Sequence, residues 1–100
     1  MNNEEIYQRA IDKWGADAQL TMLKEELAEL IVALCKFGRE INGTTKAHLA
    51  GEVADVELML QQLHFIMRKE KEDYDWDFHV ETSRLMKLAR LQDYFEGNLK

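Results

Sequence analysis

Two long stretches of the chain carry apolar residues at alternating spacings of three and four. This spacing is typical of a helix that buries one side, because one turn takes about 3.6 residues. The first stripe consists of Leu20, Leu23, Leu27, Leu30, Leu34 and Phe37. The second stripe consists of Leu49, Val53, Val56, Leu60, Leu63 and Met67. We therefore expect two long helices that pack antiparallel along these stripes.

A shorter helix is predicted ahead of the first stripe. Its apolar side consists of Ile6, Tyr7, Ala10, Ile11 and Trp14. Gly15 is expected to end it, since glycine is common just beyond a helix C-terminus. Asp17 is the expected N-cap of the following helix, which should run to about Ile41.

The break between the two long helices is predicted at Asn42-Gly43. Thr44 or Thr45 is the expected N-cap of the next helix, because a hydroxyl oxygen can accept a hydrogen bond from a free helical N–H. That helix meets no strong breaker before Asp73.

A last helix is expected to begin after an N-cap at Asp75 or Asp77 and to end near Gly97. Its apolar side consists of Leu85, Leu88, Ala89, Leu91 and Phe95. The pattern as a whole predicts an all-α, four-helix bundle-like fold. A length of 100 residues is typical of one compact core, so we expect a single domain over residues 1–100.

Two pairs of acidic residues accompany the long stripes. Glu26 with Glu29, and Glu52 with Asp55, are each three residues apart, so each pair projects from one side of a helix. Every one of these acids directly precedes a stripe residue. The pairs are therefore expected to flank the buried seam and to face each other across it.

Four carboxylates in such proximity repel one another and lose hydration, which is unfavourable unless they bind protons or a cation. Oxygen ligands alone favour Mg²⁺, with Mn²⁺ as the alternative, and they disfavour Zn²⁺. A di-iron bundle would require Glu-x-x-His pairs, and the chain has none. Mg²⁺ commonly bridges carboxylates to phosphates, so the pattern indicates phosphate-ester or phosphoanhydride chemistry.

Composition and charge limit the classes of partner that we expect for this protein. The formal net charge of −6 disfavours binding to a nucleic acid polymer, which needs clustered Lys and Arg. No apolar run has the length of a membrane span, and the N-terminus lacks the pattern of a signal peptide, so we expect a cytoplasmic protein without a membrane partner. Cys35 lies in an apolar helical stretch and is interpreted as a packed thiol.

Several other residues have a structural and a functional interpretation. Trp14 is interpreted as a core anchor, with a stacking surface for a planar ligand as the alternative. His48, one turn before Glu52, is interpreted as a surface or capping residue, although it could reach the acid site. The basic strip of the last helix is either solvated charge or, beside a metal, a site for the far phosphates of a polyphosphate. This strip consists of Arg84, Lys87 and Arg90.

The paired acids also carry a family resemblance. Glu25-Glu26-x-x-Glu29, 22 intervening residues and Glu52-x-x-Asp55 together resemble the signature of the MazG-like all-α nucleoside triphosphate pyrophosphohydrolases. Lys13-Trp14-Gly15 and the residues around both acid pairs are similar to the short, single-domain members often carried by bacteria and phages. The resemblance covers roughly residues 5–95.

The resemblance implies a MazG fold and hydrolysis of a nucleoside triphosphate to a nucleoside monophosphate and pyrophosphate. It assigns Glu26, Glu29, Glu52 and Asp55 as Mg²⁺ ligands, and Glu25 as a ligand of a further ion or a group that orients the attacking water. It also implies a homodimer or homotetramer with sites near subunit interfaces. The candidate substrate-binding residues are Lys36, Arg84, Lys87 and Arg90 for the outer phosphates, and Trp14, Tyr74 or Trp76 for the base.

Two other hypotheses remain open from the sequence. One is a noncatalytic helical interaction module whose acids only increase solubility. The other is a metal-dependent nucleotide binder without turnover.

Overall fold

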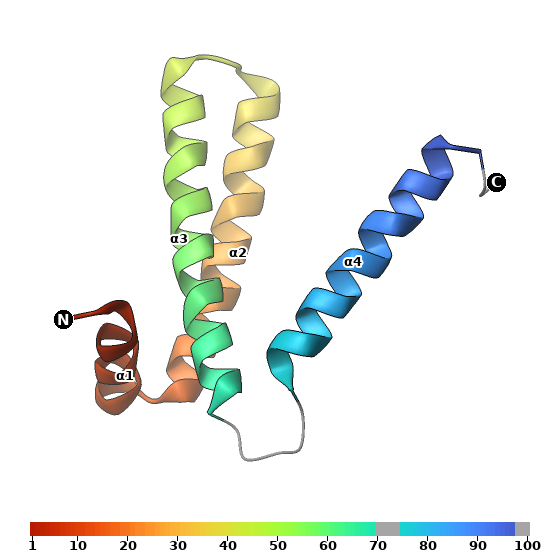
Figure 1. Ribbon diagram of the computed structural model, residues 1–100. Helices are drawn as coiled ribbons and strands as arrows, with labels where there is room; N and C mark the ends of the chain where they lie inside the picture. Colours follow the sequence, from red (N-terminus) through yellow and green to blue (C-terminus); the bar gives the residue numbers. More distant parts are fainter. Residues whose placement is uncertain (70–74, 98–100) are drawn as a thin grey trace. The chain divides into compact units, whose positions relative to one another are not determined.

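The computed structural model describes residues 1–69 and 75–97, and in these ranges it contains four α-helices and no strand (Figure 1). The helices are α1 (Asn3–Trp14), α2 (Ala16–Arg39), α3 (Gly43–Arg68) and α4 (Trp76–Phe95). The all-α prediction is confirmed. The chain divides into two compact units, Met1–Ile66 and Met67–Lys100, which are described separately below.

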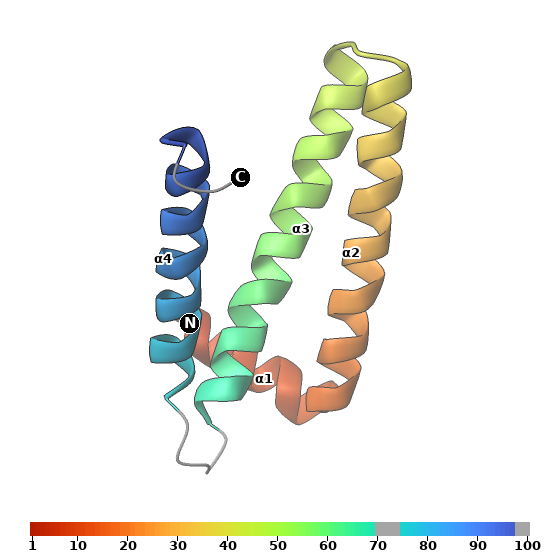
Figure 2. The same cartoon turned by 90° about the vertical axis from the view of Figure 1, so that its right-hand side faces the viewer.

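Helices α2 and α3 form an antiparallel hairpin, and they lie side by side in both views (Figures 1 and 2). Asn42, rather than Thr44 or Thr45, caps α3: its Oδ1 accepts a hydrogen bond of 2.9 Å from the Thr45 backbone N–H. Thr45 Oγ1 accepts in return from the Asn42 N–H at 3.1 Å. The side chain of each residue thus accepts a hydrogen bond from the backbone N–H of the other, as in a capping box. This arrangement stabilises the start of α3 directly after the short connection from α2.

The buried seam of the hairpin is offset by one residue from part of the predicted stripes. The buried and half-buried positions of α2 along it are Gln19, Leu23, Glu26, Leu30, Ala33 and Phe37. Those of α3 include Leu49, Glu52, Val56, Met59, Leu63 and Ile66. Four predicted stripe residues are instead exposed, namely Leu27, Leu34, Val53 and Leu60. Glu26 and Glu52 consequently lie within the seam, whereas the sequence pattern placed them at its edge.

The small side chain of Ala33 gives a physical reason for this offset. Ala33 is only 1% exposed, the lowest value in the core. A small residue at a helix–helix contact lets the two backbones approach closely, and this favours packing along the face that contains it. Leu34, one position further, then points away from the seam and remains 52% exposed.

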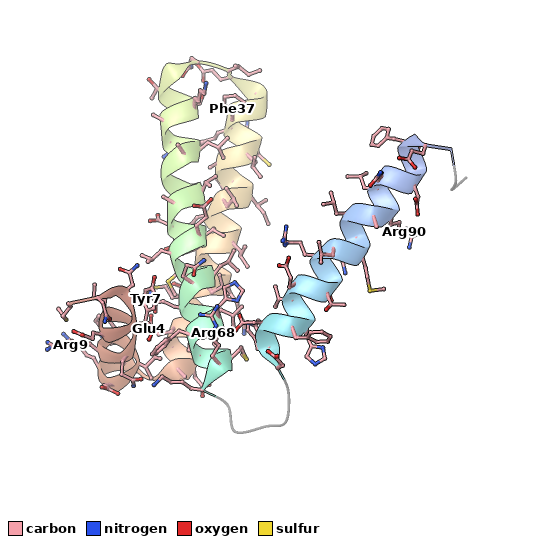
Figure 3. All side chains as sticks on the ribbon, in the orientation of Figure 1. Glu4, Tyr7, Arg9, Phe37, Arg68 and Arg90 are labelled. Atoms are coloured by element: carbon pink, nitrogen blue, oxygen red, sulfur yellow. The ribbon has the colours of Figure 1, made fainter. Side chains whose placement is uncertain are left out.

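Within the first unit, helix α1 packs on α3 through Tyr7. The ring of Tyr7 meets that of Phe65 edge to face at a centroid distance of 5.9 Å. Figure 3 shows Tyr7 on the side of α1 nearer the hairpin, whereas Arg9 points away from it. The predicted end of α1 at Gly15 is confirmed, and its φ of +90° is a conformation that glycine adopts without strain.

Three local predictions are wrong in this part of the chain. Asp17 does not cap α2, because Gly15 occupies the cap position and Asp17 lies in the first turn. Trp14 is no core anchor, since it is 59% exposed and the Lys13 ammonium lies 5.1 Å from the centre of its ring. Cys35 is an exposed thiol rather than a packed one, because it projects from the side of α2 opposite the seam.

In the second unit, Asp75 is confirmed as the N-cap of α4, with Oδ1 accepting from the Phe78 N–H at 3.2 Å. Arg68 ends α3 and donates to both carboxylate oxygens of Asp77 at 2.9 Å. Helix α3 therefore ends earlier than the predicted limit at Asp73, which lies outside the described residues together with Tyr74. Among the described residues, no helix combines the length and the apolar character needed to span a bilayer.

Candidate metal centre

Three carboxylates converge on the hairpin. Each of Glu26 on α2, and Glu52 and Asp55 on α3, offers an oxygen that lies within 4.8 Å of the oxygens offered by the other two. The antiparallel arrangement brings them together, because residues near the middle of α2 face residues near the middle of α3. The sequence prediction that the acids of the two helices face each other is thus matched by these three residues.

Two of these carboxylates each have one oxygen that is buried without a hydrogen bond. Oε2 of Glu26 and Oε2 of Glu52 are both shielded from solvent, and neither accepts a hydrogen bond. A buried carboxylate oxygen without a partner is unfavourable, since it has lost hydration and gained nothing in exchange. A proton or a cation between the carboxylates would compensate for this loss.

The electrostatics of the cluster act mainly on Glu26. Burial is the largest factor that raises the pKa of its carboxyl group above 4.5, followed by repulsion from Glu29, Asp55 and Glu52. A hydrogen bond with Glu29 raises the pKa of Glu26 further. The carboxyl group of Glu26 therefore holds a proton more tightly than a free carboxyl group does, as expected in a site of excess negative charge.

The remaining two acids of the motif differ in position. Glu29 is exposed and close enough to Glu26 to form that hydrogen bond, so it lies at the edge of the cluster. Glu25 is also exposed, and it is not part of the set of converging carboxylates.

An open groove adjoins the carboxylates. It is lined by Ala28, Glu29 and Val32 of α2 and by His48 and Glu52 of α3, and its volume is about 400 Å³. Nε2 of His48 lies 3.9 Å from Oε1 of Glu52, one helical turn away. The interpretation of His48 as a surface residue agrees with the 52% exposure of its side chain. The alternative, that it can reach the acid site from one turn before Glu52, agrees with its place in the groove lining.

The other predicted substrate residues do not line this groove. Lys36 and Trp14 are exposed residues of the first unit. Arg84, Lys87 and Arg90 all belong to α4 in the second unit, as does Trp76. Arg84 pairs with Glu81, and this hydrogen-bonded ion pair raises the pKa of the guanidinium group. The roles predicted for these residues stay predictions.

The donor set fits a hard divalent cation. Glu26, Glu52 and Asp55 supply oxygen ligands only, and the two unpartnered buried oxygens provide acceptor positions that protein donors leave unused. Mg²⁺ and Mn²⁺ prefer such ligands, whereas Zn²⁺ sites in proteins mostly contain Cys or His.

Comparison of the chain with protein-family models, with curated proteins and with solved structures found no match. The MazG-like resemblance accordingly depends on the motif residues themselves.

Proposed function

We propose that this protein is a Mg²⁺-dependent nucleoside triphosphate pyrophosphohydrolase of the MazG-like kind. One water would be consumed in cleaving the bond between the α- and β-phosphates, yielding a nucleoside monophosphate and pyrophosphate. The observation that carries the proposal is the convergence of Glu26, Glu52 and Asp55, with two buried carboxylate oxygens left without hydrogen bonds. Mn²⁺ is the alternative cation.

The proposed ligands of the cation are Glu26, Glu52 and Asp55, with Glu29 as the fourth carboxylate of the motif. Mg²⁺ held by these residues would supply positive charge to phosphate oxygens and polarise a water molecule. The protein's part is to hold the carboxylates at fixed positions on two packed helices. Rigid helical placement favours a productive geometry, because the ligands need not be ordered when substrate binds.

We propose that Glu29 accepts the proton of the attacking water. It lies at the edge of the cluster, is exposed, and also lines the groove where substrate can enter. Glu25 is proposed to bind a further ion or to orient that water. Lys36, Arg84, Lys87 and Arg90 are proposed to bind the outer phosphates, and Trp14 or Trp76 to stack on the base.

We further propose that the chain acts as a homodimer or homotetramer. Exposed apolar residues on the first unit support this, because a row of them follows α2 on the side left open by the seam. The row consists of Leu27, Ile31 and Leu34, with exposures of 41%, 62% and 52%. Sedimentation of the wild-type chain and of Ile31→Glu tests the assembly: the substitution should yield a smaller species, and a wild-type monomer would contradict it.

Pyrophosphate release tests the activity. The purified chain is incubated with a panel of canonical and modified nucleoside triphosphates, with Mg²⁺ or with EDTA, and Glu29→Gln is assayed in parallel. Release that requires both Mg²⁺ and Glu29 supports the proposal. Nucleotide binding without release would favour the binder, and neither binding nor release would favour the interaction module.

A further inference from the structure

The groove beside the carboxylates differs in chemistry from the cluster itself. Glu29 and Glu52 form the end that it shares with the cluster. Ala28 and Val32 contribute an apolar side, and His48 contributes an imidazole ring on the opposite helix. No lysine or arginine is among these five lining residues.

Most of this lining is poorly suited to phosphate. It offers a polyphosphate chain no lysine or arginine, so phosphate is favoured only at the end formed by Glu29 and Glu52, through the cation of the proposed function. An uncharged, partly apolar group needs no cationic partner. Ala28 and Val32 can contact its nonpolar surface, while Glu29 and His48 offer hydrogen-bonding atoms for its polar edge.

The volume of the groove is compatible with a small organic group. About 400 Å³ falls within the range of small-molecule clefts, which is ~300–1,000 Å³. Val32 is 54% exposed and Ala28 is exposed as well, so a ligand can reach this side of the groove.

We propose that the groove binds the nucleoside end of the substrate, and that the triphosphate extends from there across the carboxylates. The inference rests on the proposed function, and it adds the direction in which the substrate lies. Val32, Ala28 and His48 then determine which nucleosides are accepted, because they form the surface that the sugar and base contact.

The experiment compares ligands with and without a nucleoside. Mg²⁺ complexes of inorganic tripolyphosphate and of a nonhydrolysable nucleoside triphosphate are titrated calorimetrically into the wild-type chain and into Val32→Phe, which fills the groove. Leu58→Phe is the control, since Leu58 is an exposed apolar residue of α3 that does not line the groove. Affinity for Mn²⁺ alone is measured for each variant.

We expect Val32→Phe to weaken binding of the nucleoside triphosphate by about tenfold or more, in line with the effect of altered pocket shape on recognition. Its affinities for tripolyphosphate and Mn²⁺ should stay within about twofold of wild type, and Leu58→Phe should change none of the three. Val32→Ala, which removes contact without adding bulk, should weaken only the nucleoside triphosphate. It serves as the test if Val32→Phe does not fold.

Equal loss of tripolyphosphate and nucleotide affinity would assign the groove to phosphate and overturn the inference. Unchanged nucleotide affinity in both Val32 variants would overturn it as well. In either case pyrophosphate release by the wild-type chain would leave the proposed function standing. A wild-type chain that neither binds nor cleaves any nucleoside triphosphate would overturn both.

Discussion

Glu26 of α2 and Glu52 of α3 each direct one carboxylate oxygen into the interior of the hairpin, where it accepts no hydrogen bond. Both residues occupy core-facing positions between apolar neighbours, and Asp55 adds a third carboxylate within 4.8 Å. An apolar pair at these positions would stabilise the fold better, since buried charge without a partner is unfavourable. The arrangement is therefore understandable as a site for a cation.

The metal-free chain should lose stability as the pH rises. The pKa of Glu26 is raised from 4.5 in the folded state, so between 4.5 and that higher value the folded chain binds more protons than the unfolded chain. The free energy of unfolding then falls with increasing pH across this window. Urea denaturation in EDTA at a series of pH values measures this free energy. The Glu26→Gln side chain does not titrate, so the variant should lose the part of the pH dependence that comes from Glu26. The same pH dependence in wild type and variant would contradict this prediction.

Mg²⁺ or Mn²⁺ should raise the melting temperature. A ligand that binds only the folded state at 100 times its Kd adds about 2.7 kcal/mol to the free energy of unfolding. Thermal scans with MgCl₂ are compared with scans in KCl of equal ionic strength, which should show little change. Asp55→Asn should abolish the shift. Glu57→Gln is the matched control, because Glu57 is an exposed acid of the same helix outside the cluster.

The two exposed acids of the first motif should differ in their effect on turnover. Glu29 lies at the cluster edge, and Glu29→Gln should lower kcat by about 100-fold or more, as for loss of a group that transfers a proton. Glu25 is outside the converging set, so Glu25→Gln should retain more turnover at saturating Mg²⁺. Steady-state kinetics with intact far-ultraviolet circular dichroism provide the measurement. Equal losses would contradict the smaller contribution to turnover expected of Glu25.

The cap between the long helices should contribute measurably to stability. Asn42→Ala removes the bond to the Thr45 N–H and should lower the free energy of unfolding by about 1 kcal/mol. Thr44→Ala should change it by less than about 0.5 kcal/mol, because Thr44 is an exposed neighbour that does not form the cap. Denaturant titration at a pH where the acids are ionised compares the two. A larger loss for Thr44→Ala would contradict the observed capping.

The sequence by itself determined the helices and some of their ends. The spacing of apolar residues predicts the two long helices, Gly15 ends α1, and Asp75 caps α4, because these features depend on neighbours within one helical turn. The same local logic pairs Glu26 with Glu29 and Glu52 with Asp55. The prediction that the two pairs face each other depended on the assumption that the two stripes pack together.

Only the tertiary structure decided which side of each helix is buried. Helix α2 carries apolar residues on adjacent faces, so Leu27 and Leu34 fit a stripe as well as Ala33 does, and periodicity does not distinguish them. The seam that includes Glu26 and Glu52 also contains Ala33, whose small, buried side chain permits close packing of the helices. The groove at His48 and Val32 likewise requires two helices at once, since its walls come from residues that are neighbours in space and distant in sequence.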